Sequence, residues 1–272
     1  MAFSSLDSLV IDRAIKGTMF NSVTGAMIFN VEMIKDPSIE ISGTTVFADD
    51  HMGTHIMSFN RAKEAKFSAS NALFNLGLAA AQYGSTKTVA ASGSTITVPI
   101  YEEILVGETE SAANATVTLS QTPVANSVLW IYKLDGKNIG TAYSVATDAS
   151  ATEFKIVGTT VTLPTTTGAF LSTDTMAVWY EYEAEKAVSV ENGADAFAKS
   201  GRFDLEAIVH DPCSKDIQYH AHFIFPNAQL EGNSTTNLTT EGDHPFSFVA
   251  IQDYCANGQQ LFSIIIPDVD ED

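Results

Sequence analysis

The sequence predicts a mainly β protein with one flanking α-helix and a small β-sandwich inserted into the main domain. Three observations lead to this class. Apolar and polar residues alternate with period two in many short runs, which is typical of strands that bury one face. The polar residues are dominated by Thr, Ser, Asn and Gly, which suit strands and turns better than exposed helices. A Thr-, Ser-, Ala- and Val-rich middle stretch also separates two flanks with longer strand-like runs.

The N-terminal flank predicts a strand at 26–31, an alternating strand at 38–42 and an extended run at 65–70. Between these strands lies a polar, glycine-containing stretch from residue 47 to residue 55. We interpret it as a hairpin connection that is longer than a tight turn needs, and such loops commonly carry contacts to other molecules. The residues expected to make these contacts are Phe47, Asp49, Asp50, His51 and Met52.

One helix is predicted after this hairpin. Ser70 and Asn71 are suitable N-cap residues, because their side-chain oxygens can accept hydrogen bonds from the first helical amides. Gly84 is a suitable stop, because glycine readily adopts the left-handed conformation that ends many helices. The predicted helix therefore starts at this cap and runs through Tyr83, with residues at helical spacing at Leu73, Leu76, Ala80 and Tyr83.

The middle stretch predicts a small β-sandwich, because short strands recur at intervals of about ten residues between turn signals. Trp130 and Trp179 alternate with polar neighbours, and we expect them to be core aromatics. The alternative for this pair is stacking on a carbohydrate. The predicted strands are 95–98, 116–119, 127–133, 154–157, 160–163 and 177–182.

The C-terminal flank returns to longer strands, and the chain then finishes in an acidic tail. Two β-rich flanks around a compositionally different centre predict a discontinuous main domain. We place this domain at 1–94 and 186–272, with the inserted domain at 95–185. The C-terminal strands are predicted at 203–209, 219–224, 229–238, 246–252 and 260–266.

The chain is strongly acidic, with 14 Lys and Arg against 33 Asp and Glu and a net charge of −19. Residues 203–272 alone carry a net charge of −11. Phosphate binding depends on clustered Lys and Arg, so this composition argues against a protein that grips nucleic acid. The N-terminus lacks a secretory signal, and the longest apolar run, 262–267, is too short to span a bilayer. We therefore expect a protein made in the cytoplasm with no membrane partner.

The sequence contains no motif that is typical of an enzyme. Phosphate loops, dinucleotide fingerprints, nucleophile elbows and zinc-protease helices are all missing from it. Adjacent acids such as Glu102 and Glu103 point to opposite faces of a strand and make a poor catalytic pair. His220 and His222 would share a strand face with His210 nearby, but we interpret them as strand histidines at an interface rather than as zinc ligands. No catalytic residue, cofactor or metal site is therefore assigned.

Two runs near the C-terminus carry a resemblance to a known family. They are HFIFPNAQLEGN at 222–233 and TEGDHPFSFVA at 240–250. Their pattern resembles the closing part of tail tube (major tail) proteins of tailed bacteriophages. KGTMF at 16–20 and FSASNAL at 67–73 are also similar to phage virion proteins of this kind. The central segment looks like the immunoglobulin-like domains that many phage structural proteins carry on their exterior.

The resemblance implies a tail-tube-like β-barrel or sandwich with one flanking helix. Its subunits would close into hexameric rings by joining their sheets into an inner barrel, and the rings would stack into a tube. A long hairpin loop and the N-terminal arm would reach the neighbouring ring, and the stretch from Phe47 to Thr54 would be that loop. The implied location is the phage tail of the virion. The implied partners are further copies of the chain and other tail proteins.

An acidic lumen fits this implied role, because it repels DNA phosphates and lets the genome pass without specific binding. The candidate lumen acids are Glu231, Glu241 and Asp243, because they flank the strands that carry the resemblance.

Two other functions are compatible with the sequence. The first is a capsid or virion decoration protein that clamps capsomers or binds a host surface through the central sandwich. The second and weaker one is a carbohydrate-binding module that uses Trp130, Trp179 and Tyr180.

Overall fold

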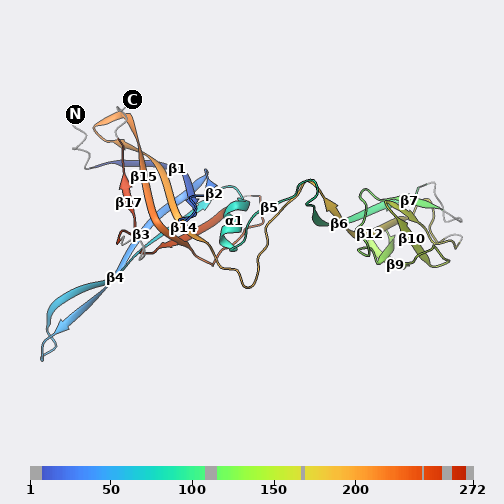
Figure 1. Ribbon diagram of the computed structural model, residues 1–272, viewed down its shortest axis with the longest axis horizontal. Coiled ribbons are helices and arrows are strands. Elements are labelled where there is room, and N and C mark those ends of the chain that lie inside the picture. The colour runs from blue at the N-terminus through green and yellow to red at the C-terminus, as the bar shows by residue number, and fades with distance from the viewer. Residues whose placement is uncertain (1–7, 108–114, 167–168, 241, 253–258, 268–272) are drawn as a thin grey trace. The chain divides into compact units, whose positions relative to one another are not determined.

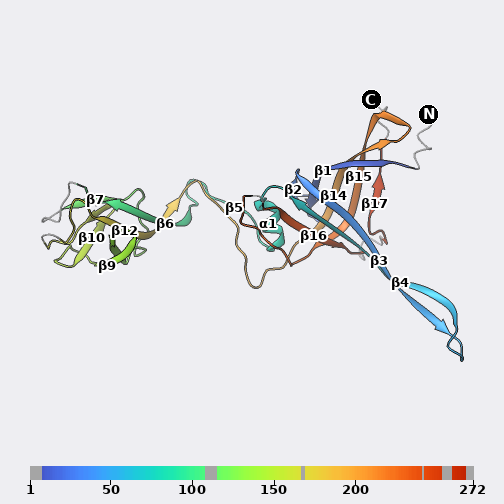
Figure 2. The same ribbon diagram turned by 180° about the vertical axis from the view of Figure 1, so that it is seen from behind.

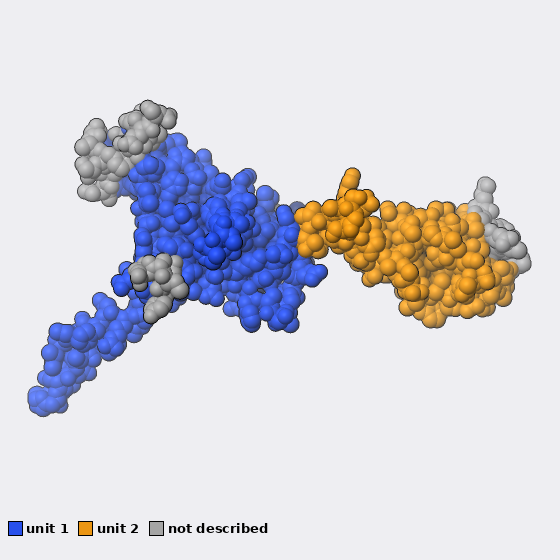
Figure 3. Space-filling view, in the orientation of Figure 1, with its two compact units in different colours: residues 1–87, 190–272 blue, residues 88–189 orange. Residues whose placement is uncertain are grey.

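The structure is a computed structural model that describes residues 8–107, 115–166, 169–240, 242–252 and 259–267. Strands dominate these residues, with one short helix among them, so the predicted mainly β class is confirmed. The chain divides into two compact units, which Figure 3 shows in different colours. Unit 1 comprises residues 1–87 and 190–272, and unit 2 comprises residues 88–189.

Unit 2 begins and ends with a pair of short strands. Strand β5 (Thr88–Val89) pairs antiparallel with β13 (Val188–Ser189), so the segments that enter and leave unit 2 lie side by side. The sequence analysis places the inserted segment at 95–185, because strands of two residues show no alternation that could be recognised.

Unit 1 is built on a sheet that curls into a half-barrel (Figures 1 and 2). The strand order is β2-β1-β14-β15-β16-β4-β3, and β17 pairs with β15 beside this path. The sheet therefore has two edges, β2 and β3, which are consecutive along the chain. Its strands are β1 (Val10–Phe20), β2 (Met27–Val31), β3 (Ile34–Asp49), β4 (His55–Asn71), β14 (Ser200–Asp211), β15 (Ser214–Leu230), β16 (His244–Ala250) and β17 (Ser263–Ile265).

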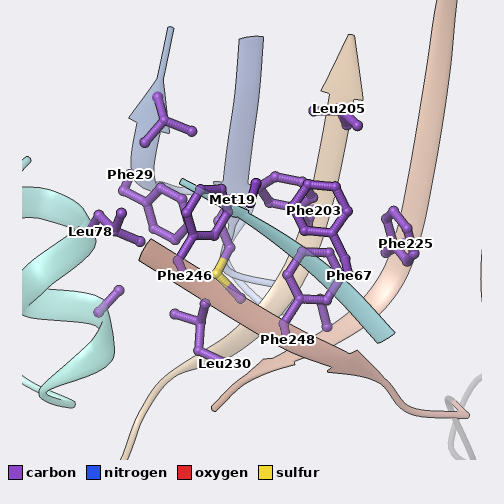
Figure 4. Close-up of a cluster of buried hydrophobic side chains, with 14 of the residues drawn as sticks. Met19, Phe29, Phe67, Leu78, Phe203, Leu205, Phe225, Leu230, Phe246 and Phe248 are labelled. Atoms are coloured by element: carbon purple, nitrogen blue, oxygen red, sulfur yellow. The ribbon is translucent and has the colours of Figure 1, made fainter. Parts of the chain in front are cut away.

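The core of unit 1 lies on one face of this sheet and is rich in phenylalanine (Figure 4). Strand alternation produces this face, because Phe246 and Phe248 are buried while Ser247 between them is only half-buried. The rings of Phe67 and Phe248 stack with centroids 4.9 Å apart, and Phe225 packs edge-on against Phe248. Burying a side chain of this size stabilises a fold by about 1.5–3 kcal/mol, so this cluster is a major source of stability.

Helix α1 (Leu76–Gln82) packs against this core and begins later than predicted. Its N-cap is Asn75, whose Oδ1 accepts hydrogen bonds from the amides of Gly77 and Leu78. The predicted stop is confirmed, because Gly84 follows the helix with a φ of 73°, which lies in the left-handed region. No helix in the described part of the chain is long and apolar enough to cross a membrane.

Ser70 and Asn71 are not the helix cap, so that prediction is wrong. Both residues remain in β4, where they pair with β16 on one side and β3 on the other. Asn is favoured both in caps and in local side-chain hydrogen bonds at the ends of other elements. The sequence therefore did not distinguish Asn71 from Asn75, and the sheet contacts decide between them.

Unit 2 is a seven-stranded sheet in the order β6-β12-β8-β9-β10-β11-β7 around its own apolar core. The pairs are antiparallel except for β9 with β10. Strand β9 is missing from the sequence prediction, because its segment mixes small and polar residues. The strands are β6 (Ile96–Leu105), β7 (Thr116–Thr118), β8 (Trp130–Asp135), β9 (Asn138–Val145), β10 (Glu153–Val157), β11 (Thr160–Thr162) and β12 (Thr175–Ala184).

The prediction that Trp130 and Trp179 are core aromatics is wrong. Their side chains are 49% and 63% exposed, whereas their sequence neighbours Ile131 and Tyr180 are buried. Both strands carry apolar residues at consecutive positions. Alternation then shows that neighbours face opposite ways, but not which of them faces the core. The two tryptophans are therefore available for contacts with other molecules.

Candidate functional site

The predicted contact residues lie at the end of a long hairpin that projects from the sheet of unit 1 (Figure 1). Strand β3 continues to Asp49 and β4 begins at His55, so the connection comprises only residues 50–54. This is an ordinary length for a hairpin, so the expectation of an unusually long loop is wrong. The length lies in the strands instead. Phe47 and Asp49 are on β3, and Asp50, His51 and Met52 are in the turn.

The turn and the strand ends beside it are held by local contacts. The Oδ1 of Asp50 accepts a hydrogen bond from the amide of Met52 at 2.8 Å. The rings of Phe47 and His55 stack with centroids 4.2 Å apart, and Oδ1 of Asp49 lies 2.5 Å from Nδ1 of His55. These contacts fix the backbone at the tip while leaving the side chains of Phe47 and Met52 exposed.

The outer part of the hairpin exposes further apolar side chains, which the sequence analysis missed. Val46 of β3 and Phe59 of β4 are partners in the ladder, and their side chains are 41% and 42% exposed. Ile56 and Met57 are exposed as well. A hairpin of two strands is only marginally stable alone in water, so apolar groups on it indicate contact with another molecule. The signal in the sequence is the group of large apolar residues at Ile56, Met57 and Phe59, but such groups ordinarily mark a core.

The sheet of unit 1 is open at both edges. Among the described strands, β2 pairs only with β1, and β3 pairs only with β4. The outer backbone groups of β3 run from Ile34 to Asp49, which is a long edge for a strand in a globular domain. An edge of this length is able to accept a further strand from another chain.

The face of the sheet opposite the phenylalanine core is polar. Lys66 lies between two buried residues of β4, and its Nζ donates a hydrogen bond to Oε1 of Glu231 at 2.7 Å. Ser247 of β16 donates a hydrogen bond to the other carboxylate oxygen of Glu231. These donors hold the pKa of Glu231 below its ordinary value, and the carboxylate in turn raises the pKa of Lys66. Glu231 is therefore a partnered acid.

Of the other two candidate lumen acids, the structure describes Asp243 but not Glu241. Oδ1 of Asp243 accepts a hydrogen bond from Nζ of Lys35 at 2.9 Å. Glu241, the N-terminal residues 1–7 and the acidic tail at 268–272 lie outside the described residues. The two described acids, Glu231 and Asp243, thus each pair with a lysine of the same chain, which the sequence did not indicate.

Further polar contacts occur on the outward face of β14 and β15. Nε of Arg202 donates to Asp204 at 2.8 Å, and Nδ1 of His220 lies 2.7 Å from Oε1 of Glu206. These contacts add side chains of both charge signs to the polar face of the described strands. Within the described ranges, no three His, Cys, Asp or Glu side chains are grouped so that they could hold a metal ion.

Comparison with known proteins identifies one family. A sequence model described as the YomU/Tube protein family matches residues 9–259, which spans all of unit 2 and most of unit 1. No curated protein matches the chain.

Proposed function

The chain belongs to the YomU/Tube protein family and is thus a phage tube-type structural protein of the virion, and we propose that it forms this tube by ring closure and ring stacking. The observation that carries the proposal is the half-barrel of unit 1 with both edges unpaired. In a ring, β2 of one copy pairs with β3 of the next, so that the half-barrels join into one closed barrel. Closure removes the exposed edges, which are otherwise sites of uncontrolled association. Six copies per ring follow from the resemblance of the outer segments to tail tube proteins.

The hairpin of β3 and β4 makes the contact between stacked rings. Its apolar side chains, with Val46 and Phe59 as partners, become buried against a neighbouring copy. Removal of apolar surface from water stabilises an interface by about 25 cal/mol per Å². Phe47 and Met52 at the tip extend this apolar surface, and Asp49, Asp50 and His51 form its polar rim.

The polar face of the half-barrel lines the channel, because a hydrated DNA duplex needs a polar wall. Glu231 and Asp243 are offset by their lysines, so they contribute little net charge individually. Unit 2 carries −7 of the chain's −19, and unit 1 carries the remaining −12. Summed over many copies, the net charge of unit 1 repels phosphates and lets DNA pass without specific binding.

Unit 2 is carried on the outside of the tube as an immunoglobulin-like β-domain. Its separate core and its paired entry and exit strands support this role, because a domain of this kind can be added to a tube subunit without changing the ring. Further partners are other tail proteins, which contact the ends of the tube. The protein acts by assembly and performs no catalysis.

Electron microscopy of the full chain tests assembly. We expect hollow tubes and six-fold rings at high protein concentration. In the double variant Val46→Ser, Phe59→Ser, tube formation should fall sharply while circular dichroism stays unchanged. The matched control, Val157→Ser, changes an exposed apolar residue on unit 2 and should leave tube formation intact. Monomers or trimers of the wild-type chain under all conditions would favour a virion decoration protein instead.

Retention of DNA by assembled tubes tests the channel. Glu231→Gln removes one negative charge and frees the Lys66 ammonium, so these tubes should retain more linear DNA at low salt than wild-type tubes. Glu181→Gln removes the same charge from an exposed position on unit 2 and serves as the control. Equal retention by the two variants would show that Glu231 does not face the DNA path.

A further inference from the structure

Three large aromatic side chains form an exposed row across one sheet face of unit 2. Tyr101 of β6 is 47% exposed, Trp179 of β12 is 63% exposed and Trp130 of β8 is 49% exposed. These strands are neighbours in the order β6-β12-β8, so one side chain comes from each of three adjacent strands. Exposed aromatic groups gathered in one place on a domain with a well-filled core indicate a binding surface.

The ladder registers place the three side chains in line. Tyr101 and Trp179 are direct partners, and their rings lie with centroids 5.8 Å apart and planes inclined by 53°. Val178 of β12 is paired with Ile131 of β8. These two strands are antiparallel, so Trp179, which follows Val178, is opposite Trp130, which precedes Ile131. Trp130 therefore lies across from Trp179, on the side away from Tyr101.

The row lies on the outward face of the sheet. Val178, Ile131 and Tyr180 are buried, so the intervening aromatic residues must face away from the core. Ala177 lies on the same outward face, where it is only 2% exposed. Its burial shows that the larger side chains around it cover the sheet there and form a continuous surface. Tyr180 itself points into the core, so it is not part of this surface.

Two carboxylates, which are hydrogen-bond acceptors, lie beside the row. Glu103 accepts a hydrogen bond from the hydroxyl of Tyr101 at 2.8 Å, and Glu181 is exposed two residues beyond Trp179. Strands β6 and β12 contain no Lys or Arg, and the one cation of β8, Lys133, is paired with Asp174 at 2.5 Å. The surface is thus aromatic and negatively charged, so it repels anionic polymers and complements a ligand whose outward groups are hydrogen-bond donors.

The spacing of the row suits a sugar chain. Adjacent strands are about 4.8 Å apart, which is close to the length of one pyranose residue in an extended polysaccharide. The flat face of a pyranose presents C–H groups of slightly positive charge, and the face of an aromatic ring is slightly negative. Because the planes of the Tyr101 and Trp179 rings are inclined by 53°, the ligand must twist between them. A β-1,4-linked chain that twists along its length can lay neighbouring sugar rings on the two aromatic rings, while its hydroxyls donate to the carboxylates.

We propose that Tyr101, Trp179 and Trp130 form a binding platform for a neutral, β-1,4-linked polysaccharide. The platform belongs to unit 2 alone and does not require ring formation. A failure to bind polysaccharide and a failure to form tubes would therefore be separate results.

Calorimetric titration of the full chain with chitohexaose and with cellohexaose tests the platform. We expect saturable binding of at least one of these neutral hexasaccharides. Trp179→Ala and Trp130→Ala should each raise Kd about tenfold, which corresponds to about 1.4 kcal/mol. Val157→Ala, an exposed apolar residue on β10 beyond β9, is the matched control and should leave Kd unchanged. Because the ligand is neutral, Kd should also be the same at low and high salt.

Several outcomes would overturn the proposal. These are no binding of either neutral hexasaccharide, binding that both tryptophan variants retain, or equally tight binding of an anionic hyaluronan hexasaccharide. Tighter binding of hexalysine, weakened by salt, would assign the row to a cationic peptide through cation–π contacts instead. Loss of self-association in Trp179→Ala, measured by sedimentation without sugar, would identify the row as a contact between copies. Circular dichroism of each variant confirms that unit 2 remains folded.

Discussion

The side chain of His244 is buried at the junction of β16 and α1, where it is only 2% exposed. Its Nε2 lies 2.8 Å from Oε1 of Gln82, and the amide of Asn75 donates to its Nδ1 at 3.4 Å. An acceptor at Nδ1 and a donor at Nε2 describe a neutral imidazole. Burial lowers the pKa of His244 below its ordinary value, which favours the same neutral form.

His244 makes the stability of unit 1 depend on pH. Below its ordinary pKa of about 6.5 the unfolded chain binds a proton that the folded chain does not, so stability falls as pH falls. The loss continues until the lowered pKa of the folded state is reached. Urea unfolding followed by circular dichroism should show this decline between about pH 7 and pH 5. His244→Phe keeps a ring beside Phe74 but cannot titrate, so its decline should be shallower. An equal decline in both proteins would assign the effect to other groups.

Gly84 is required by conformation and by space. Its φ is 73°, and a Cβ at this position would lie 2.2 Å from the carbonyl oxygen of Phe197. Gly25 has nearly the same φ, 70°, but nothing within 4 Å of the corresponding Cβ. Gly25→Ala should therefore lower the free energy of unfolding only through backbone strain, by about 1 kcal/mol. Gly84→Ala should lower the free energy of unfolding by about 2 kcal/mol more, because its Cβ would also clash with the backbone of Phe197.

Thermal unfolding of the two alanine variants measures this difference. Similar melting temperatures for Gly84→Ala and Gly25→Ala would mean that the segment around Phe197 moves freely away from the helix end. The hydrogen bond from the amide of Lys199 to the carbonyl of Ala81, at 2.9 Å, argues against such freedom.

At the scale of elements, α1 depends on contacts outside itself. Isolated helices of this length are not stable in water, because nucleation is unfavourable. Asn75 supplies two of its contacts: Oδ1 caps the first amides, and Nδ2 donates to the carbonyl of Asn30 on β2 at 2.8 Å. The same residue therefore starts the helix and attaches it to the sheet.

Two substitutions at Asn75 separate these roles. Asn75→Ala removes both and should lower the free energy of unfolding by at least about 1 kcal/mol. Asn75→Ser keeps a capping oxygen but has no group that reaches the carbonyl of Asn30, so it should be less destabilising than Asn75→Ala. Urea denaturation provides the measurement. If Ser were as harmful as Ala, the bond to β2 rather than the cap would be the main contribution.

At the scale of the whole molecule, the two units have separate cores. The buried residues of unit 1 and of unit 2 form distinct clusters. The chain passes between the units at β5 and β13, where Val89 is paired with Val188. A short turn can therefore join these two strands in place of everything between them.

Deletion of residues 90–187, with a Gly-Ser turn in their place, should leave unit 1 folded and able to assemble. Amide hydrogen exchange of β14 and β15 in the deletion variant should match that in the full chain, and electron microscopy should still show tubes. The parent chain is the control. Insoluble protein without rings would mean that unit 1 needs unit 2 in order to fold.

The sequence alone determined the features that depend on neighbouring residues. Period-two alternation predicted the mainly β class, and a glycine that tolerates a left-handed φ predicted the end of α1 at Gly84. The compositional contrast also indicated an inserted segment. These properties are local, because they arise from backbone conformation and from which side chains occupy successive positions.

Only the tertiary structure decided what depends on distant partners. Lys66 and Glu231 are 165 residues apart, and no local pattern indicates that they pair. The exposure of Trp130 and Trp179, the choice of Asn75 over Asn71 as the cap, and the long projecting strands at 41–64 likewise depend on strand order and register. The physical reason is that a side chain is buried or paired only when distant strands come together. Alternation shows that neighbouring residues face opposite sides of a strand, but it does not show which side faces the core.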